Sequence, residues 1–254
     1  MTYCVGLLVR DGLVMISDTR TNAGIDNIAS FRKLHVFEEP GERVLTVASS
    51  GNLSVTQSVL SLLAEGFAHP DTGEALLLSK CETMFQAAQL VGRAVREVYR
   101  IDGPSLEQQG GRFEVSFLLG GQMKERRLRL FMIYAAGNFI EATSDTPFLQ
   151  IGETKYGKPI LDRAVTYNTD LYDALKIGLI SMDSTMRSNL AIGLPIDILV
   201  LRRDALKSEL KHRIEAGDPY FADLRHRWSE ALKTAHLAIP RPSYGAAQTQ
   251  VAAK

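Results

Sequence analysis

The chain has 254 residues, with 29 basic and 29 acidic side chains, so its formal net charge is zero and its sequence pI is about 7.0. A balanced charge removes the long-range positive field by which proteins bind nucleic acids or anionic membrane surfaces. No apolar run approaches the roughly 20 residues that a membrane-spanning helix requires, and a hydrophobic content of 45% is enough for a sizeable core. We expect no nucleic acid and no membrane among the partners.

The cysteines and histidines show no metal-binding pattern. Cys4 and Cys81 are too few for a disulfide framework, and neither they nor the 5 histidines have the spacing of metal ligands. We therefore expect no cofactor, and a reducing compartment, the cytoplasm. The segment Met1-Thr2-Tyr3 has no basic residue and the apolar stretch after it ends at Arg10, which predicts a strand rather than a secretory signal.

The first half of the chain predicts two hairpins followed by two helices. Apolar, β-prone runs predict one hairpin over residues 3–16 and a second over 33–49, the latter turning at Pro40-Gly41. Apolar residues then recur at helical spacing over 53–67 and again over 84–99.

The second half repeats this grouping. Short strands are predicted over 113–119, 128–134, 139–143 and 148–151, with a turn at Gly120-Gly121. Helices over 159–164 and 171–182 and a strand over 196–201 follow. Clustered strands joined by hairpins favour antiparallel sheets with helices packed outside them, so we expect an α+β layered sandwich.

The C-terminal part differs in composition. Residues 207–215 and 220–237 have amphipathic patterns that predict helices, and Pro240-Arg241-Pro242 ends the second pattern. We expect one domain over residues 1–239, including C-terminal helices from about 205, and a disordered tail over 240–254.

Thr2 is the first residue with a chemical interpretation. A threonine hydroxyl is a weak nucleophile unless a base takes its proton, and a free α-amine, whose reference pKa is about 7.7–8.0, serves as such a base. Removal of Met1 places both groups on Thr2. The ordinary interpretation, the start of a strand, is favoured by position alone, so the hypothesis needs other residues.

Two charged residues at strand ends supply this support. Asp18 ends one predicted strand and Lys33 begins another, so in adjacent antiparallel strands they would meet beneath the N-terminus as a buried ion pair. An ammonium group there lowers the pKa of a neighbouring amine. Separately, each has the alternative of a solvated charge at a strand end.

Gly51 follows a predicted strand and precedes a helix. A backbone N–H at such a junction can donate to a developing oxyanion, and glycine allows close approach of a substrate. Alone, Ser50-Gly51 is equally consistent with a simple turn.

Together these residues resemble the proteasome β-subunit superfamily of N-terminal nucleophile hydrolases. The resemblance extends in element order over residues 2–201. More narrowly, the chain resembles Anbu, the bacterial ancestral β-subunit homologue of the proteasome, and the motifs that carry this likeness are Met1-Thr2-Tyr3-Cys4-Val5-Gly6 and Asp18-Thr19-Arg20-Thr21-Asn22-Ala23-Gly24.

The resemblance implies a four-layer αββα sandwich and a role for each site residue. Thr2 would be nucleophile and base, Lys33 would tune the pKa, Asp18 would orient Lys33, and Gly51 would donate to the oxyanion. Asp183 matches an aspartate that supports the threonine amine in the superfamily. Supporting candidates are Ser188, displaced from its usual spacing because Met186 stands three residues after Asp183, and Arg20.

Glu153 is a departure from the superfamily pattern. Proteasomal subunits usually have Gly-Ser-Gly where this chain has Gly152-Glu153-Thr154. A carboxylate there would raise the pKa of the amine and weaken it as a base, unless Glu153 points to solvent and Thr154 replaces the serine.

Three functions remain open from the sequence. The first is a self-assembling, proteasome-type threonine protease, forming rings or spirals of like subunits and hydrolysing peptide bonds through Thr2. The second is a narrow-specificity amidase acting on a peptide-like metabolite through the same residue. The third is a non-catalytic assembled scaffold. The sequence identifies no partner ATPase.

Overall fold

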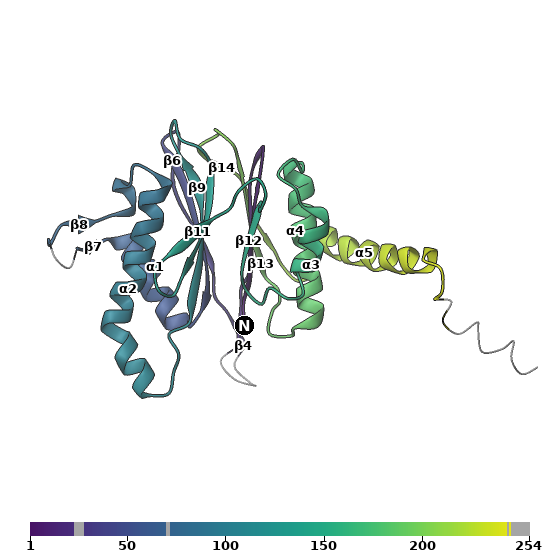
Figure 1. Ribbon diagram of the computed structural model, residues 1–254, viewed down its shortest axis with the longest axis horizontal. Coiled ribbons are helices and arrows are strands. Elements are labelled where there is room, and N and C mark those ends of the chain that lie inside the picture. Colours follow the sequence, from purple (N-terminus) through teal and green to yellow (C-terminus); the bar gives the residue numbers. More distant parts are fainter. Residues whose placement is uncertain (23–27, 70–71, 243, 245–254) are drawn as a thin grey trace, which may run out of the picture. The chain divides into compact units, whose positions relative to one another are not determined.

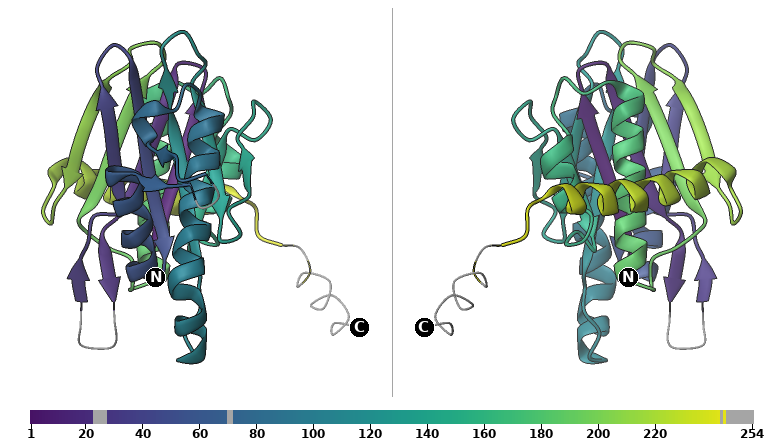
Figure 2. Two further views of the ribbon diagram at one scale, coloured as in Figure 1. Left: turned by 90° about the vertical axis from the view of Figure 1, so that its left-hand side faces the viewer. Right: turned by 90° about the vertical axis from the view of Figure 1, so that its right-hand side faces the viewer.

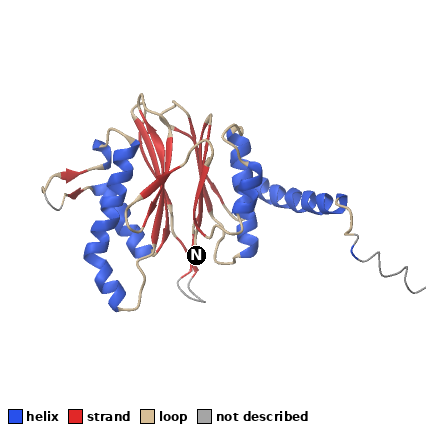
Figure 3. Ribbon diagram, in the orientation of Figure 1, coloured by secondary structure: helices blue, strands red, loops and turns tan. Residues whose placement is uncertain are grey.

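The computed structural model describes residues 1–22, 28–69, 72–242 and 244. Contacts divide the chain into two compact units, residues 1–216 and 217–254. In the first unit two sheets stack face to face between two pairs of helices (Figures 1 and 3). The predicted α+β fold, a four-layer αββα sandwich, is therefore confirmed.

The first sheet contains the N-terminal hairpin at its centre. Its strand order is β12-β1-β2-β13-β14, and all neighbours are antiparallel. The strands are β1 (Tyr3–Val9), β2 (Gly12–Asp18), β12 (Phe148–Gly152), β13 (Ile196–Arg202) and β14 (Ser208–Ile214). Every residue of β1 and β2 is buried, because both faces of this sheet are covered. That double cover explains why these strands are continuously apolar instead of alternating.

The second sheet has the strand order β11-β10-β9-β6-β5. Its strands are β5 (Leu34–Glu39), β6 (Arg43–Gly51), β9 (Val115–Met123), β10 (Arg129–Tyr134) and β11 (Phe139–Glu141). Two short hairpins complete the strands: β3 (Arg20–Asn22) with β4 (Ile28–Ser30), and β7 (Phe67–Ala68) with β8 (Ala75–Leu76). A core that includes Cys4, Leu13, Leu34 and Leu118 fills the space between the two large sheets.

Each sheet is covered by one pair of helices (Figure 2). Helices α1 (Leu53–Glu65) and α2 (Met84–Gln108) pack on the second sheet, whereas α4 (Leu171–Ser188) packs on β1 and β2 and is joined there by α3 (Lys158–Ala164). The N-terminal ends of α1, α2 and α4 are capped by the side chains of Asn52, Thr83 and Asp170, which accept backbone hydrogen bonds.

The second unit contains α5 (Pro219–Ala238), whose first turn is capped by Asp218. Leu232, Leu237 and Ile239 are exposed large apolar side chains in or after this helix. Within the described residues, no helix has the length and hydropathy needed to cross a membrane.

The structure corrects two sequence predictions. Residues 207–215 do not form a helix, and the C-terminal helices expected from about 205 reduce to α5, because 208–214 form the edge strand β14. Gly120 and Gly121 are not a turn: they lie inside β9, and the chain reverses after Met123. The predicted tail over 240–254 lies outside the described residues except for 240–242 and 244.

Candidate active site

Thr2 lies immediately before β1, with only 9% of its surface exposed, while Met1 in front of it is 66% exposed. The Thr2 carbonyl accepts a hydrogen bond of 2.8 Å from the backbone N–H of Glu153. Gly152 makes this contact sterically feasible, since its φ is 83° and a Cβ there would lie 2.0 Å from the Thr2 oxygen. The end of β12 therefore holds the backbone of Thr2.

Asp18 and Lys33 form a buried ion pair, as predicted. Lys33 Nζ lies 3.0 Å from Asp18 Oδ1, and the two side chains are 6% and 0% exposed. The ammonium also donates to the carbonyl of Arg20 at 2.6 Å, while the Tyr3 backbone N–H donates to Asp18 Oδ1 at 3.0 Å. The prediction that adjacent strands of one sheet bring them together is wrong, because Asp18 ends β2 in the first sheet and Lys33 precedes β5 in the second.

The charge state of this pair reflects opposing effects. Burial raises the pKa of the Asp18 carboxyl, and the Lys33 ammonium and the Tyr3 N–H act in the opposite direction. Among the described residues, Asp18 Oδ2 has no hydrogen-bond partner. The Lys33 ammonium is thus the main group that compensates the buried carboxylate.

Thr2, Lys33 and Gly51 line the same cavity, which has a volume of about 840 Å³. Gly51 has a φ of 117°, and a Cβ there would lie 2.0 Å from the carbonyl oxygen of Glu114, so the end of β6 requires glycine. One face of α1 also lines this cavity, with Gln57, Ser61 and Glu65 among its residues. The nucleophile candidate, the ammonium and the strand-end glycine therefore face one space open to a ligand.

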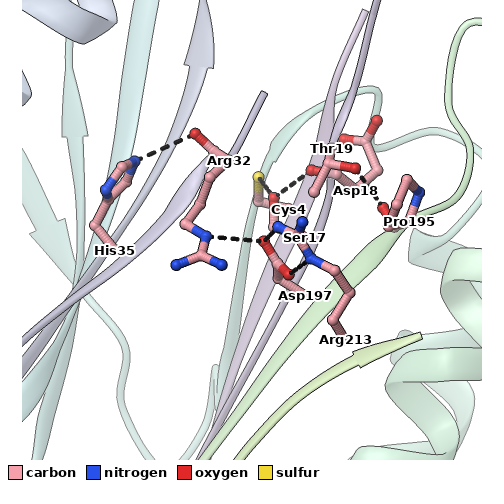
Figure 4. Close-up of polar contacts among 9 residues, drawn as sticks. All are labelled: Cys4, Ser17, Asp18, Thr19, Arg32, His35, Pro195, Asp197 and Arg213. Carbon is pink, nitrogen blue, oxygen red and sulfur yellow. Dashed lines mark hydrogen bonds and ion pairs between the residues drawn. The ribbon is translucent and has the colours of Figure 1, made fainter. Parts of the chain in front are cut away.

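A second polar cluster, drawn in Figure 4 together with Asp18, is not predicted from the sequence. Asp197 of β13 accepts two hydrogen bonds from Arg213, at 2.7 and 2.8 Å, and lies 3.9 Å from Arg32 Nε. His35 Nε2 contacts the carbonyl oxygen of Arg32 at 3.2 Å, and burial lowers the pKa of His35. The available signal was an aspartate inside the apolar run Ile196 to Leu201.

The other predicted site residues, Asp183, Ser188 and Arg20, differ in burial and in the groups they contact. Asp183 is fully buried on α4, with Arg187 Nε 3.1 Å from its Oδ2. Ser188 is exposed at the end of α4, and because five residues correspond to about 140° around a helix, it does not share the face of Asp183. Arg20 contacts Lys33 through its backbone carbonyl, whereas its guanidinium donates to the Leu190 carbonyl at 3.0 Å.

Glu153 does not point to solvent, because it is only 7% exposed. Its Oε2 accepts a hydrogen bond of 3.3 Å from the Asn189 side chain, and its Oε1 lies 3.6 Å from Lys155 Nζ. In the described part of the chain, no cluster of His, Cys, Asp and Glu side chains has the arrangement of a metal site.

Comparison with solved structures gives matches over nearly the whole chain. The Anbu (Gly-1) mutant from Hyphomicrobium sp. strain MC1 is 47% identical with a TM-score of 0.87, over 95% of this chain and 99% of that one. Anbu from Yersinia bercovieri is 48% identical with a TM-score of 0.86, over 96% and 100%. The helical assembly of the Anbu complex from Pseudomonas aeruginosa has 46% identity and a TM-score of 0.86, over 94% and 98%.

No family model and no curated protein matches the chain. The identity and the near-complete coverage of the structural matches agree with the likeness expected from the N-terminal motifs. The chain therefore belongs to the Anbu family, the proteasome-like ancestral β-subunits.

Proposed function

We propose that the protein is a self-assembling, proteasome-type threonine protease that hydrolyses peptide bonds through Thr2 after Met1 is removed. The observation that carries the proposal is the buried Lys33 ammonium, held by Asp18 and the Arg20 carbonyl, in the wall of the cavity that Thr2 also lines. A buried ion pair at a cavity is expensive to desolvate, so its place there favours a chemical role over a structural one.

The first half of the proposed reaction forms an ester. Thr2 Oγ1 attacks the carbonyl carbon of the peptide bond, and the free α-amine of Thr2 takes the hydroxyl proton. The backbone N–H of Gly51 donates to the oxyanion that develops on the carbonyl oxygen. The tetrahedral intermediate then expels the leaving amine, which takes the proton from the Thr2 ammonium, and an acyl-enzyme ester remains.

The second half regenerates the enzyme. The α-amine takes a proton from water as the water oxygen attacks the ester carbonyl, and collapse of this intermediate releases the acid and returns the proton to Thr2 Oγ1. The Lys33 ammonium stabilises the negative charge that develops near Thr2, while Asp18 keeps the ammonium in place. Asp183 is proposed to support the amine from α4. With Met1 attached, the nitrogen of Thr2 is an amide and cannot act as the base.

Assembly and location belong to the same proposal. The Pseudomonas aeruginosa relative forms a helical assembly, and we infer that this chain forms rings or spirals of like subunits in the cytoplasm. The proposed ligand is a peptide or a peptide-like molecule in the cavity beside Thr2.

Glu153 favours a second candidate, a narrow-specificity amidase with the same nucleophile. The buried carboxylate belongs to the residue whose N–H contacts the Thr2 carbonyl, and a negative charge near the α-amine weakens that amine as a base at neutral pH. Turnover of a small amide without cleavage of unfolded protein would favour this candidate over the protease.

Covalent labelling tests the proposed function. We expect the protein purified from its own host to begin at Thr2, and an epoxyketone or β-lactone probe to add one adduct per chain at Thr2. Thr2→Ala should fold and assemble but remain unlabelled. Absence of label on wild-type protein with a free Thr2 amine would refute the threonine-hydrolase mechanism and leave the scaffold function.

A further inference from the structure

Tyr3, the residue next to the candidate nucleophile, has a fully buried side chain whose hydroxyl contacts two other elements. Its Oη lies 2.6 Å from Ser181 Oγ on α4 and accepts a hydrogen bond of 2.5 Å from the Gln150 amide on β12. Because the Gln150 nitrogen is the donor in its bond, the phenol proton is available to Ser181. The hydroxyl therefore joins β1, β12 and α4.

The backbone of Tyr3 adds a fourth connection, since its N–H donates to Asp18 Oδ1 at 3.0 Å. Space around the hydroxyl is closed: a Cβ at Gly157 would lie 2.4 Å from both Tyr3 Oη and Ser181 Oγ. The group is thus fixed by hydrogen bonds and by packing. The residue that carries it follows Thr2 directly in the sequence.

An apolar residue would fill the position without desolvating a hydroxyl. Cys4, Val5 and Leu7 show that β1 is otherwise an apolar core strand, and a buried hydroxyl stabilises the fold only when it is hydrogen-bonded. Burial raises the pKa of Tyr3 to about 12, so the phenol stays neutral and retains its proton for donation. The hydroxyl contacts α4, which carries Asp183, and β12, which directly precedes Glu153, while the backbone N–H of Tyr3 contacts Asp18 at the end of β2.

We propose that Tyr3 is a positioning residue for Thr2: its hydroxyl ties the start of β1 to Ser181 and Gln150 and so fixes the nucleophile in the cavity wall. The inference rests on the proposed function, because Thr2 must be the reacting residue. Tyr3 does not itself line the cavity. Its effect should therefore fall on the chemical step and not on ligand binding.

The test compares Tyr3→Phe and Ser181→Ala with wild type, using protein that begins at Thr2, whether trimmed in the host or released from a cleavable leader. Tyr99→Phe is the matched control, because its hydroxyl bonds Glu107 on the exposed side of α2. We expect Tyr3→Phe to lower the maximal rate of β-lactone labelling about tenfold, since small misplacement of a reacting group has effects of this size or larger. The half-saturating probe concentration should stay the same.

Ser181→Ala removes the bond to Tyr3 from the α4 side and leaves the Gln150 bond, so it should also slow labelling, and the double variant should be no slower than Tyr3→Phe alone. Tyr99→Phe should match wild type. If Tyr3→Phe lowers thermal stability while the labelling rate stays within twofold of wild type, Tyr3 is structural and the inference is wrong.

A second readout needs no catalysis. Periodate cleaves an N-terminal threonine between the carbons that bear the amine and the hydroxyl, at a rate that depends on how freely the terminus moves. Loss of one hydrogen bond should speed this cleavage roughly fivefold in Tyr3→Phe and leave it unchanged in Tyr99→Phe. If wild type reacts with periodate but never with the β-lactone, the proposed function fails. In that case the rate of periodate cleavage in Tyr3→Phe relative to wild type decides whether Tyr3 positions Thr2.

Discussion

Asp18→Asn isolates the charge of the buried pair with little change in shape. The asparagine oxygen can still accept the hydrogen bond from the Tyr3 N–H, but Lys33 loses its counter-charge. Lys33 is only 5% exposed, and its other hydrogen bond in the described residues goes to the neutral carbonyl of Arg20. The substitution therefore leaves a buried ammonium without a carboxylate.

The magnitude follows from burial. Breaking a buried pair by removing one partner destabilises a protein by about 3–5 kcal/mol, because the remaining charge is desolvated without compensation. The short bond of 2.6 Å to the Arg20 carbonyl and the adjoining cavity place the expected loss at the lower end, about 3 kcal/mol. Exposed pairs contribute much less.

Glu42→Gln is the matched control for this substitution. It breaks a Lys–carboxylate pair of comparable length, 2.7 Å to Lys124, in which both side chains are half exposed. We expect it to leave the free energy of unfolding unchanged within error. The comparison therefore varies burial while the chemistry of the pair stays the same.

Urea unfolding at one fixed protein concentration measures both variants, because self-association adds a concentration-dependent contribution to stability. Lys33→Met combined with Asp18→Asn should recover part of the loss, since the double variant has no buried charge left. Equal effects of Asp18→Asn and Glu42→Gln, or purely additive losses in the double variant, would refute the reasoning.

Three further outcomes follow from the site. Burial raises the pKa of Tyr3 from 10.0 to about 12, so the unfolded chain releases this proton at lower pH than the folded protein. The free energy of unfolding should therefore fall by about 3 kcal/mol as the pH rises from 10 to 12. Unfolding curves measured across this pH range should not show this fall in Tyr3→Phe. Gly152→Ala should destabilise the protein far more than Gly41→Ala in the same urea assay, because a Cβ at Gly152 meets the Thr2 oxygen at 2.0 Å, whereas Gly41 has a similar positive φ with open space around it; equal losses would contradict the steric argument. The pKa of the Cys4 thiol is raised by burial to about 12, so native protein at pH 8 should leave Cys4 unmodified by iodoacetamide, which peptide mapping can verify; modification faster than global unfolding would contradict this burial.

Residues whose chemistry is local could be predicted from the sequence. The positions of Thr2, Lys33 and Gly51 at the ends of predicted strands indicate site residues, and the three residues line one cavity. The sequence does not predict why Asp18 and Lys33 meet, because hairpin patterns indicate only which strands pair within one sheet. The contact instead depends on how two sheets stack, which is a long-range property of the whole chain.

The misassigned helix over 207–215 has a specific cause. Leu210 and Ile214 are four residues apart, a spacing that places them on one face of either a helix or a strand. The charged residues between them resemble the solvent side of an amphipathic helix, whereas in the structure they alternate along an edge strand paired with β13. Pairing with β13 determines that these residues form a strand and not a helix. A short stretch of sequence around residues 207–215 contains no information about that pairing.

The strand order of the first sheet has a consequence for synthesis on the ribosome. The hairpin of β1 and β2 leaves the ribosome first, but its neighbours are β12, from Phe148, and β13, which ends at Arg202. The edge at β1 therefore remains open until about three-fifths of the chain has been translated, and the edge at β2 until about four-fifths. A nascent chain of this kind carries Thr2 and Asp18 without the surroundings that the proposed mechanism requires, so under that mechanism the order of translation would delay the reaction until β13 has paired with β2.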